Sequence, residues 1–406
     1  MKDTIFSPAD ILLPDYTQDS PLWKCWSVIA CDQHSSEMQY WDSAAGIVGD
    51  APSTLNLILP EAYLETPKAD EQKDKIKRTM LDVGTPLRRF DDALIYVERD
   101  LPGAGTRRGL VGRLDLEYYD YARDTDSAVR PTEQTVVDRL PPRVKVREKA
   151  RYELPHTMVF ADKFDAVMDF LTDRRADMEK FYDFELMLGG GHLTGYLVEG
   201  EILRQTVQRI ADYESSFAGG AMTYAVGDGN HSLAAAKLHY ESHKGVPGYE
   251  SSRWTLCEIV DVRDSAIVFE PIYRTVMTND VGAFLSALSK ICGEGEQRVT
   301  CITAEGEQEF SFASPDHALT VGTLQNFIDR YIADHPDTKC DYIHGEDAVR
   351  RLGAKPGHIG FIFRGVAKDE LFTYVDTNGV LPRKAFSMGD SLSKRYYTEM
   401  RQIQKA

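Results

Sequence analysis

Strand-like and helix-like apolar patterns alternate along nearly the whole chain, and this alternation constrains the fold more than any other feature. Residues 93–97 and 109–116 have the apolar content of strands, and a glycine-containing turn at residues 102–105 joins them. Residues 164–181 place apolar side chains three and four residues apart, which is helical spacing. A chain that mixes the two patterns is expected to form an α/β or α+β fold rather than a helical bundle or a β-sandwich.

The same criteria predict elements in the rest of the chain. Further strands are predicted at residues 184–188, 193–198, 222–226, 254–262, 267–271, 298–302 and 358–363. Further helices are predicted at residues 201–213, around residues 324–331, and at the C-terminus over residues 391–403.

The length and proline content of the chain predict more than one structural part. A chain of 406 residues is long enough for two or three domains. Residues 123–149 contain Pro131, Pro141 and Pro142 with several charges and few large apolar residues, so we predict a linker or a surface excursion there. Residues 1–122 would then form the N-terminal part of the core, and residues 150–406 the main α/β part.

Charge and cysteine content exclude several classes of protein. Lys and Arg number 47 against 64 Asp and Glu, a net charge of −17, which disfavours nucleic acid and anionic membranes as partners. The six cysteines form no CxxC pair, and none has a histidine at zinc-finger spacing, so we expect no zinc, haem or iron–sulfur group. The N-terminus lacks the pattern of a signal peptide and no segment has 18 consecutive apolar residues, so a cytoplasmic protein is expected.

The sharpest local motif is Val226-Gly227-Asp228-Gly229-Asn230-His231-Ser232, between a predicted strand and an Ala-rich helix. Glycines allow a tight turn and close approach of a ligand, and the N–H groups at a helix start attract an anion such as phosphate. The alternative is a plain turn followed by an ordinary N-cap. The motif is neither a Walker A loop nor a GxGxxG fingerprint. The predicted phosphate-binding residues are Gly227, Gly229, Asn230, Ser232, Lys237 and Arg274, and the predicted catalytic residues are His231, Asp228 and Asp32.

Asp32 follows the apolar run at residues 28–30, so its carboxylate is a candidate general base or metal ligand at a strand end. A solvated turn is the alternative. His156 could line the same cleft or be a structural histidine, and Arg274 is a candidate anion ligand. Arg383 and Lys384 could close over the cleft or belong to a solvated basic segment. Neither a metal ion nor the oligomeric state is predicted.

An ordered series of motifs resembles the domain-of-unknown-function 1015 family over nearly the entire chain. The motifs are Val28-Ile29-Ala30-Cys31-Asp32-Gln33 with Tyr40-Trp41, Glu153-Leu154-Pro155-His156, Tyr182-Asp183-Phe184-Glu185, Ala225 to Ser232, Phe269-Glu270-Pro271-Ile272-Tyr273-Arg274 and Leu381-Pro382-Arg383-Lys384. That family is similar to the ParB and sulfiredoxin-like superfamily, whose members include nucleotide-binding partitioning proteins and a free-serine kinase.

The link to this superfamily depends mainly on one motif. Many relatives carry Asp-Gly-His-His-Arg where this chain has Asp228 to Ser232, so Asp228, Gly229 and His231 match while Asn230 and Ser232 depart. The missing arginine removes a bidentate phosphate donor, which leaves the kind of phosphate ligand open.

The resemblance implies an α+β fold with a mixed-sheet, ParB/sulfiredoxin-like core and an additional family-specific lobe. It implies a small-molecule phosphotransferase or phosphate-ligand enzyme, acting on serine or a related metabolite and using ATP or ADP with Mg. The alternatives are a non-catalytic nucleotide-responsive binding protein and a phosphatase. In each case the expected partner is a small phosphorylated ligand.

Overall fold

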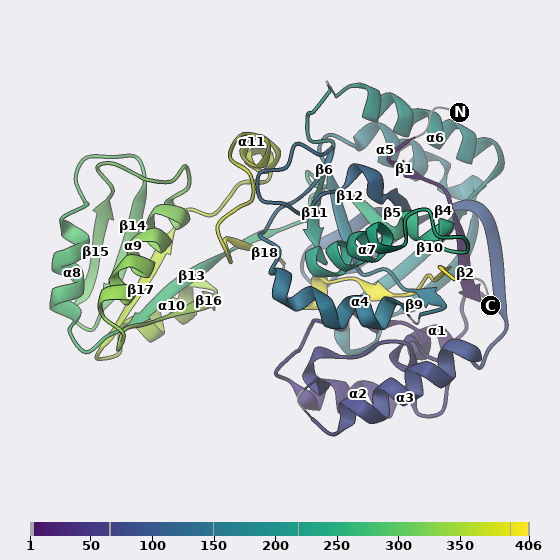
Figure 1. Cartoon of the computed structure of the whole chain (residues 1–406), viewed down its shortest axis with the longest axis horizontal. Coiled ribbons are helices and arrows are strands. Elements are labelled where there is room, and N and C mark those ends of the chain that lie inside the picture. Colours follow the sequence, from purple (N-terminus) through teal and green to yellow (C-terminus); the bar gives the residue numbers. More distant parts are fainter. Residues whose placement is uncertain (1–3, 65, 149, 218, 390, 405–406) are drawn as a thin grey trace. The chain divides into compact units, whose positions relative to one another are not determined.

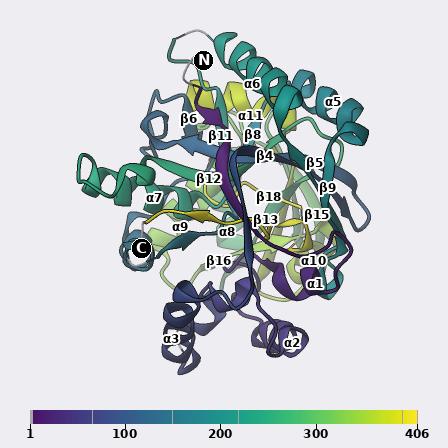
Figure 2. The ribbon, with the colours of Figure 1, turned by 90° about the vertical axis from the view of Figure 1, so that its right-hand side faces the viewer.

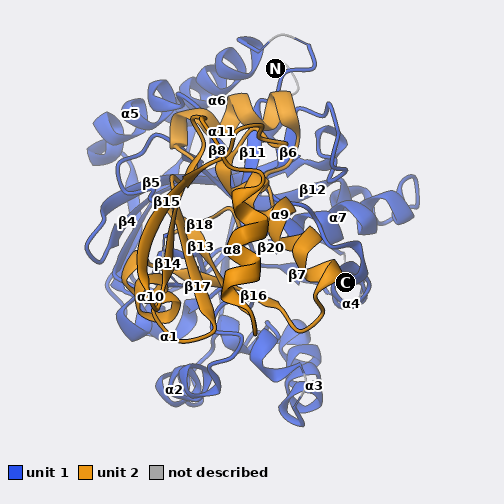
Figure 3. Ribbon diagram, turned by 90° about the vertical axis from the view of Figure 1, so that its left-hand side faces the viewer, with its two compact units in different colours: residues 1–268, 389–406 blue, residues 269–388 orange. Residues whose placement is uncertain are grey.

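The chain folds into two compact units that do not coincide with the predicted division. The computed structural model describes residues 4–64, 66–148, 150–217, 219–389 and 391–404 (Figure 1). Unit 1 comprises residues 1–268 and 389–406, and unit 2 comprises residues 269–388 (Figure 3). The compact units therefore separate after Val268 and again after Met388, and residues 123–149 lie inside unit 1.

Unit 1 is built on a ten-stranded mixed sheet. Its strand order is β6-β11-β8-β12-β5-β4-β10-β9, and β1 and β2 pair with β5 and β4. The β11–β6 and β12–β8 pairs are parallel and the others are antiparallel. The strands are β1 Phe6–Ser7, β2 Ala9–Pro14, β4 Leu87–Leu101, β5 Gly105–Asp115, β6 Val129–Pro131, β8 Met158–Ala161, β9 Glu179–Glu185, β10 His192–Val198, β11 Tyr224–Asp228 and β12 Trp254–Asp261.

Each face of this sheet carries an apolar core. Neighbouring residues of a strand point to opposite faces and so contribute to different cores. In β4, Leu94 and Tyr96 belong to one apolar core, while Ile95 and Val97 belong to the other. The first core includes side chains of α5, α6 and α7, and the second includes side chains of α1, α2 and α3; Figures 1 and 2 show α5 and α6 on the opposite side of the sheet from α2 and α3. The helices are α1 Leu22–Trp26, α2 Met38–Val48, α3 Lys68–Leu81, α4 Leu140–Glu148, α5 Asp165–Arg174, α6 Gly200–Ser215 and α7 Asn230–His243.

Several predicted elements are confirmed, and the mixed α/β class with them. The predicted strands at residues 93–97 and 109–116 are the hairpin of β4 and β5. The predicted helix at residues 164–181 is shorter than expected, since α5 ends at Arg174 and β9 begins at Glu179. Residues 123–148 contribute β6, which pairs with β11, and α4, which packs on α7; residue 149 lies outside the described residues.

The C-terminal helix predicted over residues 391–403 is wrong. After a short 3-10 helix at Ser391–Ser393, this segment is extended: β19 (Tyr396–Tyr397) pairs with β3 (Val28–Ile29), and β20 (Arg401–Gln402) pairs with β7 (Tyr152–Glu153). Arg395 forms ion pairs with Glu258 and Glu399, and Arg401 forms one with Glu153. The long-range buried pairs with Glu258 and Glu153 outweigh the local helical pattern.

Unit 2 has its own antiparallel sheet in the order β15-β14-β17-β13-β16, and β18 pairs with β13. The strands are β13 Phe269–Met277, β14 Arg298–Thr303, β15 Gly306–Ser311, β16 Lys339–His344, β17 His358–Phe363 and β18 Phe386–Met388. The helices are α8 Val281–Ser289, α9 Thr320–Asp334, α10 Glu346–Gly353 and α11 Lys368–Asn378. In the described part of the chain, no helix is both long enough and apolar enough to cross a membrane.

Candidate functional site

The glycine-rich motif forms a turn from a strand to a helix, as its spacing predicts. β11 ends at Asp228, Gly229 adopts φ +79°, and α7 begins at Asn230. A Cβ at Gly229 would lie 3.0 Å from the Thr157 Cα, so both the conformation and the space require glycine. A Cβ at Gly227 would collide with the Phe160 ring, which makes this glycine a packing requirement. Within the part of the chain that the structure describes, no side chain caps the N-terminus of α7.

Two oxygens beside this turn are buried and accept no hydrogen bond from the described residues, Oδ2 of Asp228 and Oδ1 of Asn230. The Lys394 ammonium lies 3.5 Å from Asp228 Oδ2, and both side chains are largely buried. The C-terminal segment therefore brings a positive charge to the turn before α7.

His231, in the first turn of α7, is held by a backbone group. The Val136 N–H donates to its Nε2 over 3.2 Å, so a neutral ring carries its proton on Nδ1. Burial lowers the pKa of His231, and Arg143 and Arg139 lower it further. His231 is thus neutral near pH 7 and can donate a hydrogen bond from Nδ1, whereas its Nε2 is occupied.

Asp32 and His156 meet although they are far apart in sequence. Asp32 Oδ2 lies 4.0 Å from His156 Nε2, and Nδ1 of His156 lies 2.8 Å from the Tyr397 hydroxyl. Burial raises the pKa of Asp32, but His156, a hydrogen bond from Gln33 and Lys394 outweigh it, so the pKa is lowered. Asp32 is therefore a carboxylate at neutral pH.

Electrostatic interactions join these parts into one cluster within unit 1. Asp32 interacts with His231 as well as with His156 and Lys394, and Glu61 interacts with Asp32, His156 and Arg143. Arg143 also forms an ion pair with Glu61. We call this group the Asp32 cluster: Asp32, Glu61, Arg143, His156, Asp228, His231 and Lys394.

Unit 1 also contains a groove of about 590 Å³, and most of its lining residues follow Asp32 closely in the sequence. It is lined by Ser36 to Tyr40, by Ser43 and by Leu188. The Tyr40 ring stacks on His34 with 3.7 Å between centroids. The groove has the size of a small-molecule site.

The thiol of Cys31, next to Asp32, is unsuited to nucleophilic chemistry. Burial raises its pKa to about 12, and Asp32 contributes to the shift. Because the thiolate is the reactive form, this cysteine remains an unreactive thiol at neutral pH.

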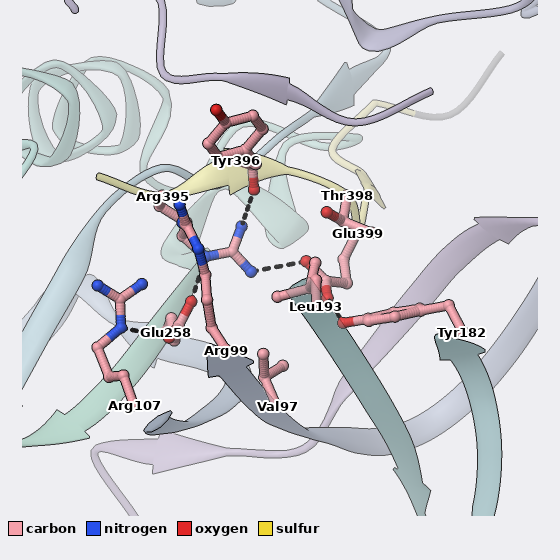
Figure 4. A pocket seen from close by; sticks show the side chains of 10 residues that line it. All are labelled: Val97, Arg99, Arg107, Tyr182, Leu193, Glu258, Arg395, Tyr396, Thr398 and Glu399. Atoms are coloured by element: carbon pink, nitrogen blue, oxygen red, sulfur yellow. Dashed lines mark hydrogen bonds and ion pairs between the residues drawn. The ribbon is translucent and has the colours of Figure 1, made fainter. Parts of the chain in front are cut away.

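A second cavity holds structural charges. It has a volume of about 10 Å³, enough for about one water molecule, and lies among buried charged side chains (Figure 4). Figure 4 shows Arg395 between Glu258 and Glu399. Arg99 and Arg107 donate to backbone carbonyls of residues 392–394. The ion pairs and hydrogen bonds around this cavity anchor the C-terminal segment that carries Lys394 and Tyr397.

Comparison with known proteins shows the family. The model of DUF1015, described as a protein of unknown function, matches residues 13–352. The chain belongs to the DUF1015 family. The search of curated proteins found no match to this DUF1015 member.

Solved structures align with this DUF1015 member at low identity. A free serine kinase mutant in complex with ADP aligns at 12% identity with a TM-score of 0.38, covering 72% of this chain and 91% of that chain. A conserved hypothetical protein from Pyrococcus furiosus aligns at 12% identity with a TM-score of 0.35, covering 72% and 94%. C-terminally truncated SbnI from Staphylococcus aureus aligns at 8% identity with a TM-score of 0.35, covering 68% and 81%.

Four of the predicted site residues are not members of the Asp32 cluster and make other contacts. The Lys237 ammonium donates to the Leu116 carbonyl over 2.9 Å and pairs with Glu241 at 2.6 Å. Arg274, Arg383 and Lys384 belong to unit 2. The Arg274 side chain is fully buried, and it donates to Gln325 and to the carbonyls of Arg383 and Lys384. These contacts favour a structural role for Lys237 and Arg274.

Sequence reasoning missed Glu61, Arg143, Lys394 and Tyr397. Arg143 lies on α4, in the segment interpreted as a linker, and Lys394 and Tyr397 lie in the segment predicted as a helix. A local pattern carries no signal for such side chains, because only the long-range pairing of β19 with β3 and the packing of α4 on α7 place them.

Proposed function

We propose that unit 1 of this DUF1015 member carries a small-molecule phosphotransferase site at the Asp32 cluster. The single observation that carries the proposal is an uncapped helix N-terminus and a lysine within one electrostatic cluster with an ionised carboxylate. Phosphoryl transfer needs these parts: a phosphate site, positive charge near the transferred group, and a base for the acceptor hydroxyl.

The phosphate would bind at the start of α7. Its first N–H groups and the helix dipole attract an anion. Lys394 supplies a positive charge beside Asp228, and the Nδ1–H of His231 supplies a further donor on the first turn. In this proposal Lys394 takes the role that the sequence assigned to Lys237.

The acceptor would be a hydroxyl compound bound at Asp32. Asp32 takes the hydroxyl proton, the hydroxyl oxygen forms the new bond to phosphorus, and the bond between phosphorus and the leaving oxygen breaks. The leaving phosphate keeps the electron pair of that bond, and the cations of the cluster stabilise its charge. Because Asp32 is already ionised at neutral pH, it can accept the proton without prior activation.

The donor we propose is ATP or ADP with Mg. Among the described residues, no group of three or more His, Cys, Asp and Glu side chains is arranged to hold a metal. The two buried acceptor oxygens, on Asp228 and Asn230, are nevertheless ligands that suit Mg, which commonly takes its remaining ligands from water and phosphate. Bound Mg would neutralise phosphate charge, and Asp228 and Asn230 would orient it.

The test measures phosphate transfer from ATP or ADP to a panel of small alcohols that includes serine. Phosphorus NMR detects the products, and Mg is present in the reaction. Asp32→Asn should abolish transfer and keep nucleotide binding, because it removes the base and retains the shape of the side chain. Lys394→Met should weaken nucleotide binding, measured as a smaller thermal shift. Lys237→Met is the matched control, since its ammonium is bound by Leu116 and Glu241, and it should leave binding unchanged.

Other outcomes select the alternatives. Nucleotide binding without transfer to any alcohol, together with nucleotide-dependent capture of a partner, indicates a binding protein. Hydrolysis of phosphoserine without nucleotide indicates a phosphatase. A loss of nucleotide binding in Lys237→Met but not in Lys394→Met would contradict the assignment of the phosphate site.

A further inference from the structure

We propose that Tyr397 is a positioning residue that fixes the proton of His156 on Nε2, so that His156 presents an N–H donor toward Asp32. The proposal rests on the hydrogen bonds of one buried phenol. Tyr397 is 2% exposed and comes from β19, while His156 follows β7 and Asp32 follows β3.

Among the described residues, the Tyr397 hydroxyl has three hydrogen-bonding neighbours. The Cys31 N–H donates to its oxygen over 3.2 Å, and His156 Nδ1 lies 2.8 Å away. The Cys31 thiol is the third neighbour, and sulfur is a weak acceptor. An imidazole nitrogen without a proton is the best acceptor the phenol can reach.

Two proton arrangements are conceivable for the bond between Tyr397 and His156. If Nδ1 carried the proton and donated to the phenol oxygen, the hydroxyl proton would have only the thiol sulfur to bind. A buried donor without a good acceptor is unfavourable, because it has lost its hydrogen bond to water. The phenol therefore donates to Nδ1, and the neutral ring carries its proton on Nε2.

This tautomer gives the Asp32 and His156 pair a defined polarity. The 4.0 Å between Asp32 Oδ2 and His156 Nε2 exceeds a hydrogen bond, yet one oxygen atom can lie within hydrogen-bond distance of both. A hydroxyl group suits that position, because it accepts from Nε2–H and donates to the carboxylate. A carbonyl or phosphate oxygen only accepts, and Asp32 would repel it. This step deepens the proposed function by assigning the site to an alcohol, whereas the tautomer itself does not depend on that function.

Nitrogen NMR of protein labelled with ¹⁵N-histidine tests the tautomer without any ligand. The His156 signals are identified by their loss in His156→Gln, and couplings to the ring protons show which nitrogen carries hydrogen. In the neutral ring of the wild type, we expect the hydrogen on Nε2 and none on Nδ1. We expect Tyr397→Phe to populate the Nδ1–H form, because the donor to Nδ1 is gone.

Tyr396→Phe is the matched control, since the neighbouring hydroxyl donates to the Met187 carbonyl over 3.1 Å. It should leave the His156 signals unchanged, whereas a general disturbance of the C-terminal segment would alter them in both variants. An Nδ1–H ring in the wild type overturns the proposal, whatever the result for Tyr397→Phe. An unchanged tautomer in folded Tyr397→Phe overturns it as well.

A second measurement separates this proposal from the proposed function. Absence of phosphate transfer together with the Nε2–H tautomer refutes the function and supports the role of Tyr397. Transfer to an alcohol together with an Nδ1–H ring supports the function and refutes the role of Tyr397.

Discussion

His239 on α7 should make the stability of unit 1 fall as the pH decreases. Its side chain is 1% exposed, and within the described residues neither ring nitrogen has a hydrogen-bond partner. Burial lowers the pKa of His239 from 6.5 to about 4, and Arg147 and His243 add to the lowering. The folded protein therefore excludes a proton that the unfolded chain binds.

The size of the effect follows from the two pKa values. A difference between 6.5 and about 4 corresponds to about 3 kcal/mol of unfolding free energy. Because the folded-state pKa is the lower one, this contribution is complete above pH 6.5. It is lost progressively as the pH falls toward and through about 4.

Urea unfolding followed by tryptophan fluorescence isolates unit 1, because Trp23, Trp26, Trp41 and Trp254 all lie in it. His239→Gln removes the titration but keeps a buried polar group, so its stability relative to the wild type should rise by up to about 3 kcal/mol between pH 7 and pH 4. His239→Leu should show the same rise and should also gain about 1–3 kcal/mol at pH 7, since it removes the unpaired nitrogens.

The comparison of the two variants separates titration from polarity. Equal stability differences between the wild type and His239→Gln at pH 7 and at pH 4 would falsify the burial argument. A His239→Leu variant that is no more stable than His239→Gln at pH 7 would show that the ring nitrogens are satisfied in solution.

Three further predictions concern other residues of unit 1. Partial burial lowers the pKa of His192, but hydrogen bonds to Asp183 and Glu185 outweigh this effect and raise the pKa. The stability that these hydrogen bonds add is therefore lost as the pH rises through the raised folded-state pKa. In urea unfolding, His192→Gln should cost about 1 kcal/mol at pH 5.5 and little at pH 8.5. Gly229→Ala should destabilise by more than the about 1–2 kcal/mol expected for Gly245→Ala, since both have positive φ but only Gly229 would also press a Cβ against Thr157, and equal thermal shifts would refute the contact. Arg395→Met removes the buried guanidinium that pairs with Glu258 and Glu399, leaves Glu258 only its longer pair with Arg107, and should cost about 3–5 kcal/mol. Arg204→Met, at an exposed pair with Glu201, should cost less than about 1 kcal/mol in the same measurement.

Local patterns predict those elements that local physics determines. The strands at residues 93–97 and 109–116 are predicted correctly because their apolar runs and the turn between them form one hairpin. Residues 391–403 also have apolar side chains at a spacing that a helix tolerates, but their environment is decided by Glu153 and Glu258. A segment whose partners lie more than a hundred residues away carries no local record of them.

The candidate site likewise has parts that the sequence predicts and parts that it does not. The turn at Gly229 is evident from the sequence, because a positive φ and a following helix have a glycine signature. Helical spacing alone predicts Lys237 as a phosphate ligand, and this spacing cannot show that the Lys237 ammonium donates to the Leu116 carbonyl. Lys394 has no motif around it, and only the fold brings it to Asp228.

The buried ion pairs of the C-terminal segment also fix which residues of that segment lie at the candidate site. Successive side chains of an extended chain point to opposite sides, so a shift by one residue would exchange the two faces. Such a shift would take Arg395 from Glu258 and Arg401 from Glu153, which leaves buried charges unpaired and is strongly unfavourable. The same shift would move Tyr397 away from His156 and Lys394 away from Asp228. The arginine pairs thus fix the position at which a lysine and a tyrosine from the end of the chain meet residues from its beginning and its middle.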